Sequence, residues 1–220
     1  MTITLGPGST VMFTGDSITG SGRLEGELPL GSGYALRIAG EWGLRHPDRA
    51  VTWLNTGIAG NTVRDLEARW RTDVLDVRPD VVSILVGIND VGRPSYDPDG
   101  HAVSTQEYAA GHDRLLAPLA EAGAELVLIE PFLLPVRGGI EVGDVILDEE
   151  VRRRWRADLD PKIQAVRELA RTHGAQLLAA DGLFAQLAAT TAPEYWTAAG
   201  VHPTPSGHAA LAEGWLRLVA

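Results

Sequence analysis

The amino-acid sequence predicts an α/β domain with an open parallel sheet and helices on both of its faces. Short runs of apolar and β-branched residues alternate along the chain with longer segments whose apolar residues recur at the helical period. The runs are continuously apolar rather than alternating, which is typical of parallel strands covered on both faces. With 220 residues, 45% of them hydrophobic, the chain is long enough to bury the core that such a domain needs.

Five of these runs are predicted to form the strands of a five-stranded parallel sheet. They are too short to span a bilayer, which needs about 20 apolar residues in a helix. Because parallel strands are joined by crossovers, a helix is expected between successive strands. The predicted strands are residues 10–14 (TVMFT), 50–56 (AVTWLNT), 80–87 (DVVSILVG), 125–131 (ELVLIEP) and 175–181 (AQLLAAD).

The segments between and after these runs carry the apolar stripe of amphipathic helices. In the segment 151–170, Asp160-Pro161 resembles an N-cap followed by proline at the first helical position, which leaves an interruption open at that point. The predicted helices are residues 33–46, 63–77, 105–122, 151–170 and 205–219.

Two stretches rich in glycine and proline, 91–103 and 133–148, fit neither pattern. Long loops after strands are where binding sites form in α/β domains, although both stretches are equally consistent with surface insertions. No internal repeat, low-complexity tract or linker divides the chain. We therefore expect a single domain over residues 1–220.

Composition narrows the classes of partner and cofactor. The formal charge of −10 argues against nucleic acid and anionic membranes, because both require clustered lysine and arginine. The absence of cysteine excludes disulfides, a thiolate nucleophile and cysteine-ligated metals. No basic segment followed by a long apolar run opens the chain, so we expect a cytoplasmic protein.

Polar residues suited to acyl transfer follow the predicted strands, where ligands bind in a doubly wound sheet. Ser17 (in TGDSITG), Gly60 (in NTGIAGNTVRD) and Asn89 (in VGINDVG) follow the first three strands, and His202 (in GVHPTPSGH) precedes the last helix. A serine nucleophile needs a base, which His202 can supply. The backbone N–H groups of Ser17 and Gly60 and the Asn89 amide can stabilise an oxyanion.

Each signal is weak alone, because Gly-Asp-Ser is also a common helix N-cap and an isolated histidine is often structural. Together and in this order they resemble the SGNH (GDSL-like) hydrolases, from Val11 to about Ala210. The resemblance implies a flavodoxin-like three-layer α/β/α fold and a serine ester hydrolase without cofactor or metal. It also implies Ser17 as nucleophile, His202 as base, and an oxyanion hole of Ser17, Gly60 and Asn89.

Two stretches, GIAGNTVRDLEARW and GINDVGR, are similar to bacterial acetylxylan esterases and related carbohydrate deacetylases. This similarity implies removal of a short acyl group, most simply acetyl, from a small-molecule or saccharide ester, and a possible homo-oligomer. The alternatives are a lipase- or thioesterase-like member acting on other acyl esters and a non-catalytic carbohydrate-binding protein. A dinucleotide fingerprint and a Gly-x-Ser-x-Gly elbow are both absent from the sequence.

One position departs from the family pattern. The last block usually reads Asp-x-x-His, and Ala199 stands where the aspartate is expected. Three interpretations remain open: an Asp→Ala replacement that lowers activity, a natural Ser–His dyad, or a pseudoenzyme. In a dyad a backbone carbonyl, a water or another acid would hold His202, and Glu194 and Asp181 are the candidate acids.

Other polar residues near the motifs are expected to be structural or remain ambiguous. Asp16 is expected to brace the turn at Ser17, Asp90 to be structural, and His208 to be a surface or packing residue. Trp196 suits a wall of the acyl pocket and, equally, the core or an interface. The two arginines of the unassigned loops, Arg93 and Arg137, suit either substrate contact or solvated charge.

Overall fold

The computed structural model describes residues 2–97, 99–137, 140–142 and 145–220. Parts of the two unassigned stretches, at positions 98, 138, 139, 143 and 144, lie outside the described residues. Among the described helices, none is both long and apolar enough to cross a membrane.

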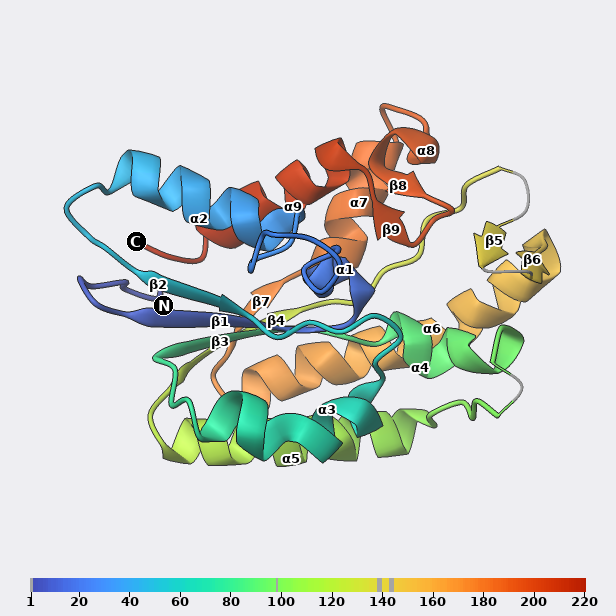
Figure 1. Ribbon diagram of the computed structural model, residues 1–220. Helices are drawn as coiled ribbons and strands as arrows, with labels where there is room; N and C mark the ends of the chain where they lie inside the picture. The colour runs from blue at the N-terminus through green and yellow to red at the C-terminus, as the bar shows by residue number, and fades with distance from the viewer. Residues whose placement is uncertain (1, 98, 138–139, 143–144) are drawn as a thin grey trace.

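A five-stranded parallel sheet forms the centre of the molecule, in the order β2-β1-β3-β4-β7 (Figure 1). All five predicted strands are confirmed. The observed strands are mostly shorter than the predicted runs, because the ends of those runs are irregular segments and, at Ala180, the start of a helix. The strands are β1 (Thr10–Gly15), β2 (Thr52–Asn55), β3 (Val81–Leu85), β4 (Glu125–Ile129) and β7 (Gln176–Leu178).

The order of the strands fixes where a site forms. After β1 the chain adds β2 on one side, and then returns to add β3 on the other side of β1. This change of direction makes the carboxyl ends of β1 and β3 a topological switch point, where open α/β sheets bind their ligands. Ser17 lies two residues after β1 ends at Gly15, and Asn89 lies four residues after β3 ends at Leu85.

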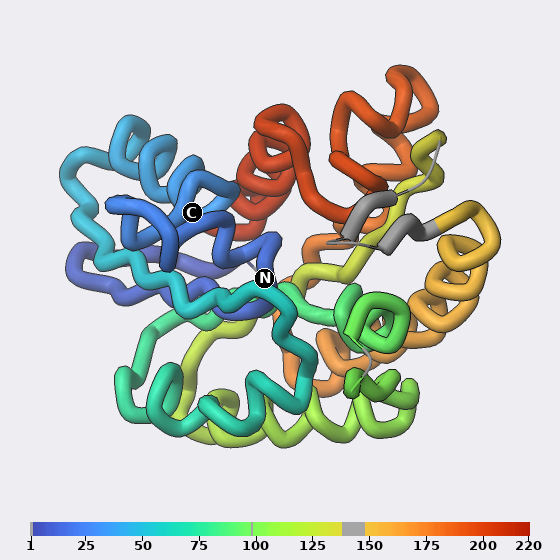
Figure 2. Tube along the Cα trace, turned by 45° about the vertical axis from the view of Figure 1, so that its right-hand side comes forward, coloured from blue at the N-terminus to red at the C-terminus, as the bar shows by residue number. Residues whose placement is uncertain are grey.

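Two layers of helices cover the sheet, which confirms the three-layer α/β/α prediction (Figure 1). One face carries α2 (Tyr34–Arg45), α7 (Ala180–Ala188) and α9 (Pro205–Leu216), with α2 and α9 side by side in both views (Figures 1 and 2). The opposite face carries α3 (Val63–Trp70), α5 (Thr105–Glu121) and α6 (Glu149–Thr172).

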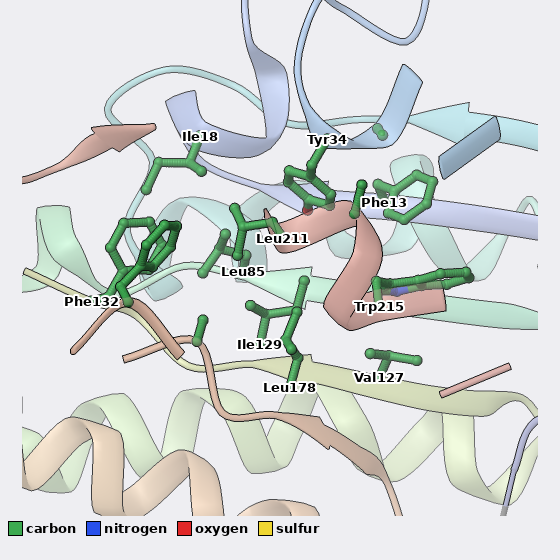
Figure 3. Packing of buried hydrophobic residues seen from close by; sticks show 14 of the residues in the cluster. Phe13, Ile18, Tyr34, Leu85, Val127, Ile129, Phe132, Leu178, Leu211 and Trp215 are labelled. Atoms are coloured by element: carbon green, nitrogen blue, oxygen red, sulfur yellow. The ribbon is translucent and has the colours of Figure 1, made fainter. Parts of the chain in front are cut away.

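Burial on both faces explains the continuous apolar runs. Along β1, Val11 and Phe13 belong to the core under α2 and α9, whereas Met12 belongs to the core over α3 and α5. On the first face the ring centroid of Phe13 lies 5.6 Å from that of Tyr34 and 5.5 Å from that of Trp215 (Figure 3). Alternate residues therefore enter different cores, and both must be apolar.

One open point of the helix predictions is settled, and two helix predictions need correction. The helix α6 continues through Pro161 without interruption, since apolar residues on either side, Leu159 and Ile163, pack into the core. The predicted helix 63–77 ends as an α-helix at Trp70, continues as the π-helical turn η1 (Arg71–Leu75), and leaves Val77 on the surface. The final helix ends at Leu216 rather than at residue 219.

Short elements that the sequence did not indicate surround the carboxyl edge of the sheet. The helix α7, unpredicted, begins at Ala180, inside the run 175–181 that was expected to be wholly strand. The other short elements are α1 (Ser17–Gly20), α4 (Ile88–Gly92), η2 (Arg93–Ser95), α8 (Pro193–Trp196), the hairpin of β5 (Ile140–Val142) and β6 (Val145–Leu147), and the hairpin of β8 (Thr197–Ala198) and β9 (His202–Pro203).

Candidate active site

The fold brings the predicted nucleophile and base into contact. Ser17 is the first residue of α1, and the Asp16 carboxylate caps this helix by accepting a hydrogen bond from Ile18 N (2.9 Å). His202 opens β9, 185 residues further along the chain. Its Nε2 lies 3.0 Å from the Ser17 hydroxyl oxygen, which is hydrogen-bonding distance. This geometry lets the imidazole take a proton from the hydroxyl group.

The other two predicted oxyanion donors, Gly60 on the loop after β2 and Asn89 on α4, lie at the same edge of the sheet. Gly60 has a φ of +79°, which glycine adopts without strain, and the nearby Ile58 N donates to Gly15 O at the end of β1 (3.1 Å). In α4, Asn89 Nδ2 donates to Asn61 O (3.1 Å). The loop of Gly60 and the amide of Asn89 are therefore joined directly.

Arg69 is a residue of this edge that sequence reasoning missed. Its guanidinium donates to Asn61 Oδ1 (2.9 Å) and to Gly15 O (3.3 Å), and it pairs with Asp73 (2.6 Å). It thus joins β1 to the loop of Gly60. The only signal in the sequence is the i,i+4 spacing to Asp73, which predicts an ion pair on α3 but not the reach to the loop.

A polar cavity of about 350 Å³ opens beside the Gly60 loop. Arg93 lines this cavity. Its guanidinium forms ion pairs with Asp65 Oδ2 and Asp97 Oδ2, each at 3.0 Å. The charge of Arg93 is therefore paired with two carboxylates at the edge of a cavity. This arrangement argues against the solvated charge that was one of the two expectations for Arg93. The cavity is lined by Ala59, Gly60, Asn61, Asp65, Arg93, Tyr96 and Asp97.

A second cavity, of about 930 Å³, lies between the segment after β4 and the start of α6. The structure places Arg137 here and not at the polar cavity, with its backbone N–H bonded to Glu194 (2.6 Å). The lining residues are Leu133, Leu134, Pro135, Val136, Arg137, Asp148, Glu149, Arg152, Arg153 and Arg156. Across the described part of the chain, no group of three or more metal-binding side chains gathers.

The ring of His202 is held from one side. Within the described residues, the only hydrogen bond to its side chain is the one to Ser17. Both candidate acids are engaged elsewhere, because Asp181 forms a double hydrogen bond with Arg156 (2.6 and 2.8 Å) and Glu194 binds the Arg137 N–H. Although His202 reaches the surface, desolvation of the ring lowers its pKa below the ordinary value of 6.5.

Ala199 occupies a turn whose backbone suits another residue. Ala199 and Gly200 have φ values of +58° and +81°, and Val201 N donates to Ala198 O across the turn (3.1 Å). Positive φ at both central positions is the requirement of a type I′ turn, where Asn-Gly and Asp-Gly are strongly preferred. Glycine is needed at 200, since a Cβ there would lie 2.4 Å from Leu134 O. Alanine is the unfavoured residue of the pair.

Three neighbouring residues are structural, as predicted. The buried Asp16 braces the turn at Ser17, and the buried Asp90 accepts a hydrogen bond from Val63 N (3.0 Å). His208 Nδ1 accepts a hydrogen bond from Tyr34 N (3.1 Å). Trp196 packs, partly buried, against the core under α9, which favours the core role over a wall of the acyl pocket.

A serine hydroxyl paired with a histidine at the switch point of a parallel sheet, without a Gly-x-Ser-x-Gly elbow, defines a class of carboxylic ester hydrolases. The model of the GDSL-like lipase/acylhydrolase family matches residues 13–210, and the chain belongs to this family. It is a carboxylic ester hydrolase of the SGNH type.

Individual relatives agree with this assignment. The chain is 33% identical to an acetylxylan esterase of Geobacillus stearothermophilus, over 97% of the chain and 94% of the relative. A crystal structure of that esterase superimposes with a TM-score of 0.81 over 97% of this chain and 94% of the other. A putative GDSL-like lipase from Parabacteroides merdae reaches 0.86 at 28% identity, over 99% and 98%.

Proposed function

We propose that the chain is a single catalytic domain in which Ser17 is the nucleophile and His202 the general base. Ser17 Oγ attacks the ester carbonyl while His202 Nε2 takes the hydroxyl proton, and the imidazolium then returns this proton to the leaving alcohol. A water molecule, activated by the same imidazole, hydrolyses the acyl-enzyme. The 3.0 Å contact between Ser17 and His202 is the observation that carries this proposal.

The oxyanion of each tetrahedral intermediate is stabilised by the backbone N–H groups of Ser17 and Gly60 and by one N–H of the Asn89 amide. The second N–H of that amide is bonded to Asn61 O, which holds the side chain in place. Such donors act without reorganisation in the transition state, because the Gly60 loop is already tied to β1 and itself holds the Asn89 amide.

The proposed substrate is a short acyl ester, most simply an acetyl ester, of a carbohydrate. The named activity of the Geobacillus relative supports it. The polar cavity beside Gly60 supports it as well, because Asp65, Arg93 and Asp97 offer hydrogen-bonding groups to the hydroxyls of a sugar.

We further propose that Ala199 replaces the aspartate of a Ser–His–Asp triad and that this lowers activity. The turn favours aspartate over alanine, and no described acid holds His202. A catalytic mutant of the Geobacillus esterase with an aspartate changed to alanine has the same fold as this chain, with a TM-score of 0.82.

The test is steady-state hydrolysis of p-nitrophenyl acetate and of an acetylated xylooligosaccharide. We expect Ser17→Ala to abolish the hydrolysis that the unsubstituted chain performs, and longer p-nitrophenyl acyl esters to react more slowly than the acetate. Unchanged rates in Ser17→Ala would refute the proposed nucleophile. Faster reaction of long acyl esters would instead favour a lipase-like member of the family.

A further inference from the structure

The side-chain amide of Asn89 is held at both of its ends. Tyr96 donates its hydroxyl hydrogen to Asn89 Oδ1 (2.6 Å), and Asn89 Nδ2 donates to Asn61 O (3.1 Å). A carbonyl oxygen can only accept, so Asn61 requires the nitrogen of the amide on its side. The hydroxyl of Tyr96 then faces the amide oxygen. One N–H of Asn89 remains without either partner, and its direction is fixed by the two bonds.

Tyr96 is itself well anchored, although it lies in the glycine- and proline-rich stretch after α4. Its backbone N–H closes the short helix η2 by donating to Arg93 O (3.2 Å). Its ring packs edge-on against Trp155 of α6, with 6.5 Å between centroids, and Trp155 Nε1 donates to Ser95 Oγ (2.9 Å). The phenol is therefore positioned by α6, an element on the far side of the loop.

The hydroxyl of Tyr96 remains a donor throughout the working pH range. Burial raises the pKa of Tyr96 to about 12, so the phenol stays protonated at neutral and mildly basic pH. Tyr96 also lines the polar cavity together with Gly60 and Asn61. It thus lies between the proposed alcohol-binding region and the oxyanion donors.

We propose that Tyr96 is a positioning residue for ester hydrolysis: its hydroxyl orients the Asn89 amide so that the free N–H points at the oxyanion. This rests on the proposed role of Asn89. Because negative charge develops on the substrate oxygen only as the transition state is approached, a loss of orientation lowers kcat while KM changes little. We expect a loss of about tenfold, since Asn61 O still holds one end of the amide.

A double-mutant cycle tests the proposal, measured on p-nitrophenyl acetate in the unsubstituted chain and, for the higher rate expected there, in an Ala199→Asp background. The variants are Tyr96→Phe, Asn89→Ala and the two combined, with Tyr195→Phe as a matched control on a tyrosine that is 55% exposed. We expect Asn89→Ala to lower kcat by roughly 10²–10³-fold. Tyr96→Phe should lower kcat by about tenfold on its own and by less than twofold when Asn89 is already alanine.

Two results would overturn the role of Tyr96 and leave the proposed function intact. One is a tenfold loss from Tyr96→Phe that persists in the Asn89→Ala background, which would mean that Tyr96 acts independently of the amide. The other is a rise in KM at unchanged kcat, which would make Tyr96 a substrate contact. Full activity in Asn89→Ala would be a failure of the proposed oxyanion hole itself. Thermal unfolding of each variant separates these effects from a loss of folding.

Discussion

The two sides of the candidate active site are held very differently. On the oxyanion side, Asn89 is bonded at both ends of its amide, and Arg69 joins the Gly60 loop to β1. On the base side, His202 lies on a hairpin of two-residue strands, and within the described residues its ring hydrogen-bonds only to Ser17. The site therefore combines proposed oxyanion donors that are firmly held with a proposed base that is weakly oriented, and we expect the base side to limit the rate.

The largest expected effect comes from strengthening that weaker side. Ala199→Asp should raise the rate on p-nitrophenyl acetate by on the order of 10⁴-fold, the loss in kcat that serine proteases show when the triad aspartate is removed. The new carboxylate would orient the His202 ring and stabilise the imidazolium. The measurement is kcat/KM for the two chains side by side.

Ala199→Asn is the matched control for this change. Asparagine suits the positive φ of the turn as well as aspartate does, so both variants should unfold at a higher temperature than the parent. Only aspartate carries the charge, so only Ala199→Asp should gain the large rate. Equal and substantial rates in all three proteins would mean that the Ser–His pair works as a dyad, which contradicts the proposed loss of an acid.

The residues that sequence reasoning found are those whose signal is local. Ser17 and Asn89 stand just beyond continuous apolar runs, so the predicted sheet alone placed them at one edge. Tyr96 and Arg69 were not assigned to the site because their roles depend on contacts across the fold, Tyr96 on Trp155 of α6 and Arg69 on the loop before α3. No spacing in the sequence encodes such contacts.

The same reasoning explains the errors in the elements. The apolar residues of 175–181 were interpreted as one strand. The strand β7 ends at Leu178, and α7 begins at Ala180. Asp160-Pro161 looked like a helix start, yet tertiary packing of the flanking apolar residues keeps α6 continuous. Local propensity was overridden in both places by the core that the segment had to cover.

The acidic limb of the pH–rate profile provides a smaller test of the base side. His202 must be neutral to accept the Ser17 proton, and desolvation lowers its pKa below 6.5. The chain should therefore keep its activity to a lower pH than an ordinary histidine would allow. In Ala199→Asp the neighbouring carboxylate favours the imidazolium, so the limb should move to higher pH.

The measurement is kcat/KM between pH 4 and 8 for both chains. If the limb in Ala199→Asp stayed in place or moved to lower pH, the new carboxylate would not be interacting with His202. The proposed triad would then fail on the base side, whatever the change in absolute rate.

The smallest expected effect concerns the oxyanion side, where two buried carboxyl groups support the loops. Burial raises the pKa of both Asp16 and Asp90 from 3.8 to about 7, against the opposing effect of the backbone hydrogen bonds from Ile18 and Val63. Between pH 3.8 and about 7, Asp16 and Asp90 keep their protons in the folded chain and have released them in the unfolded chain. Stability is therefore fully present below the unfolded pKa and falls as pH rises toward about 7.

Asp90→Asn tests this contribution, because asparagine keeps the oxygen that accepts from Val63 N and cannot ionise. Urea unfolding of parent and variant at several pH values between 4 and 8 should give a shallower fall in the free energy of unfolding for the variant. The difference between the two curves reports the ionisation of Asp90 together with its effect on Asp16, whose pKa the Asp90 charge helps to raise. Parallel curves would mean that Asp90 ionises at its ordinary pKa, and that the preorganised side of the site carries a buried charge rather than a buried proton.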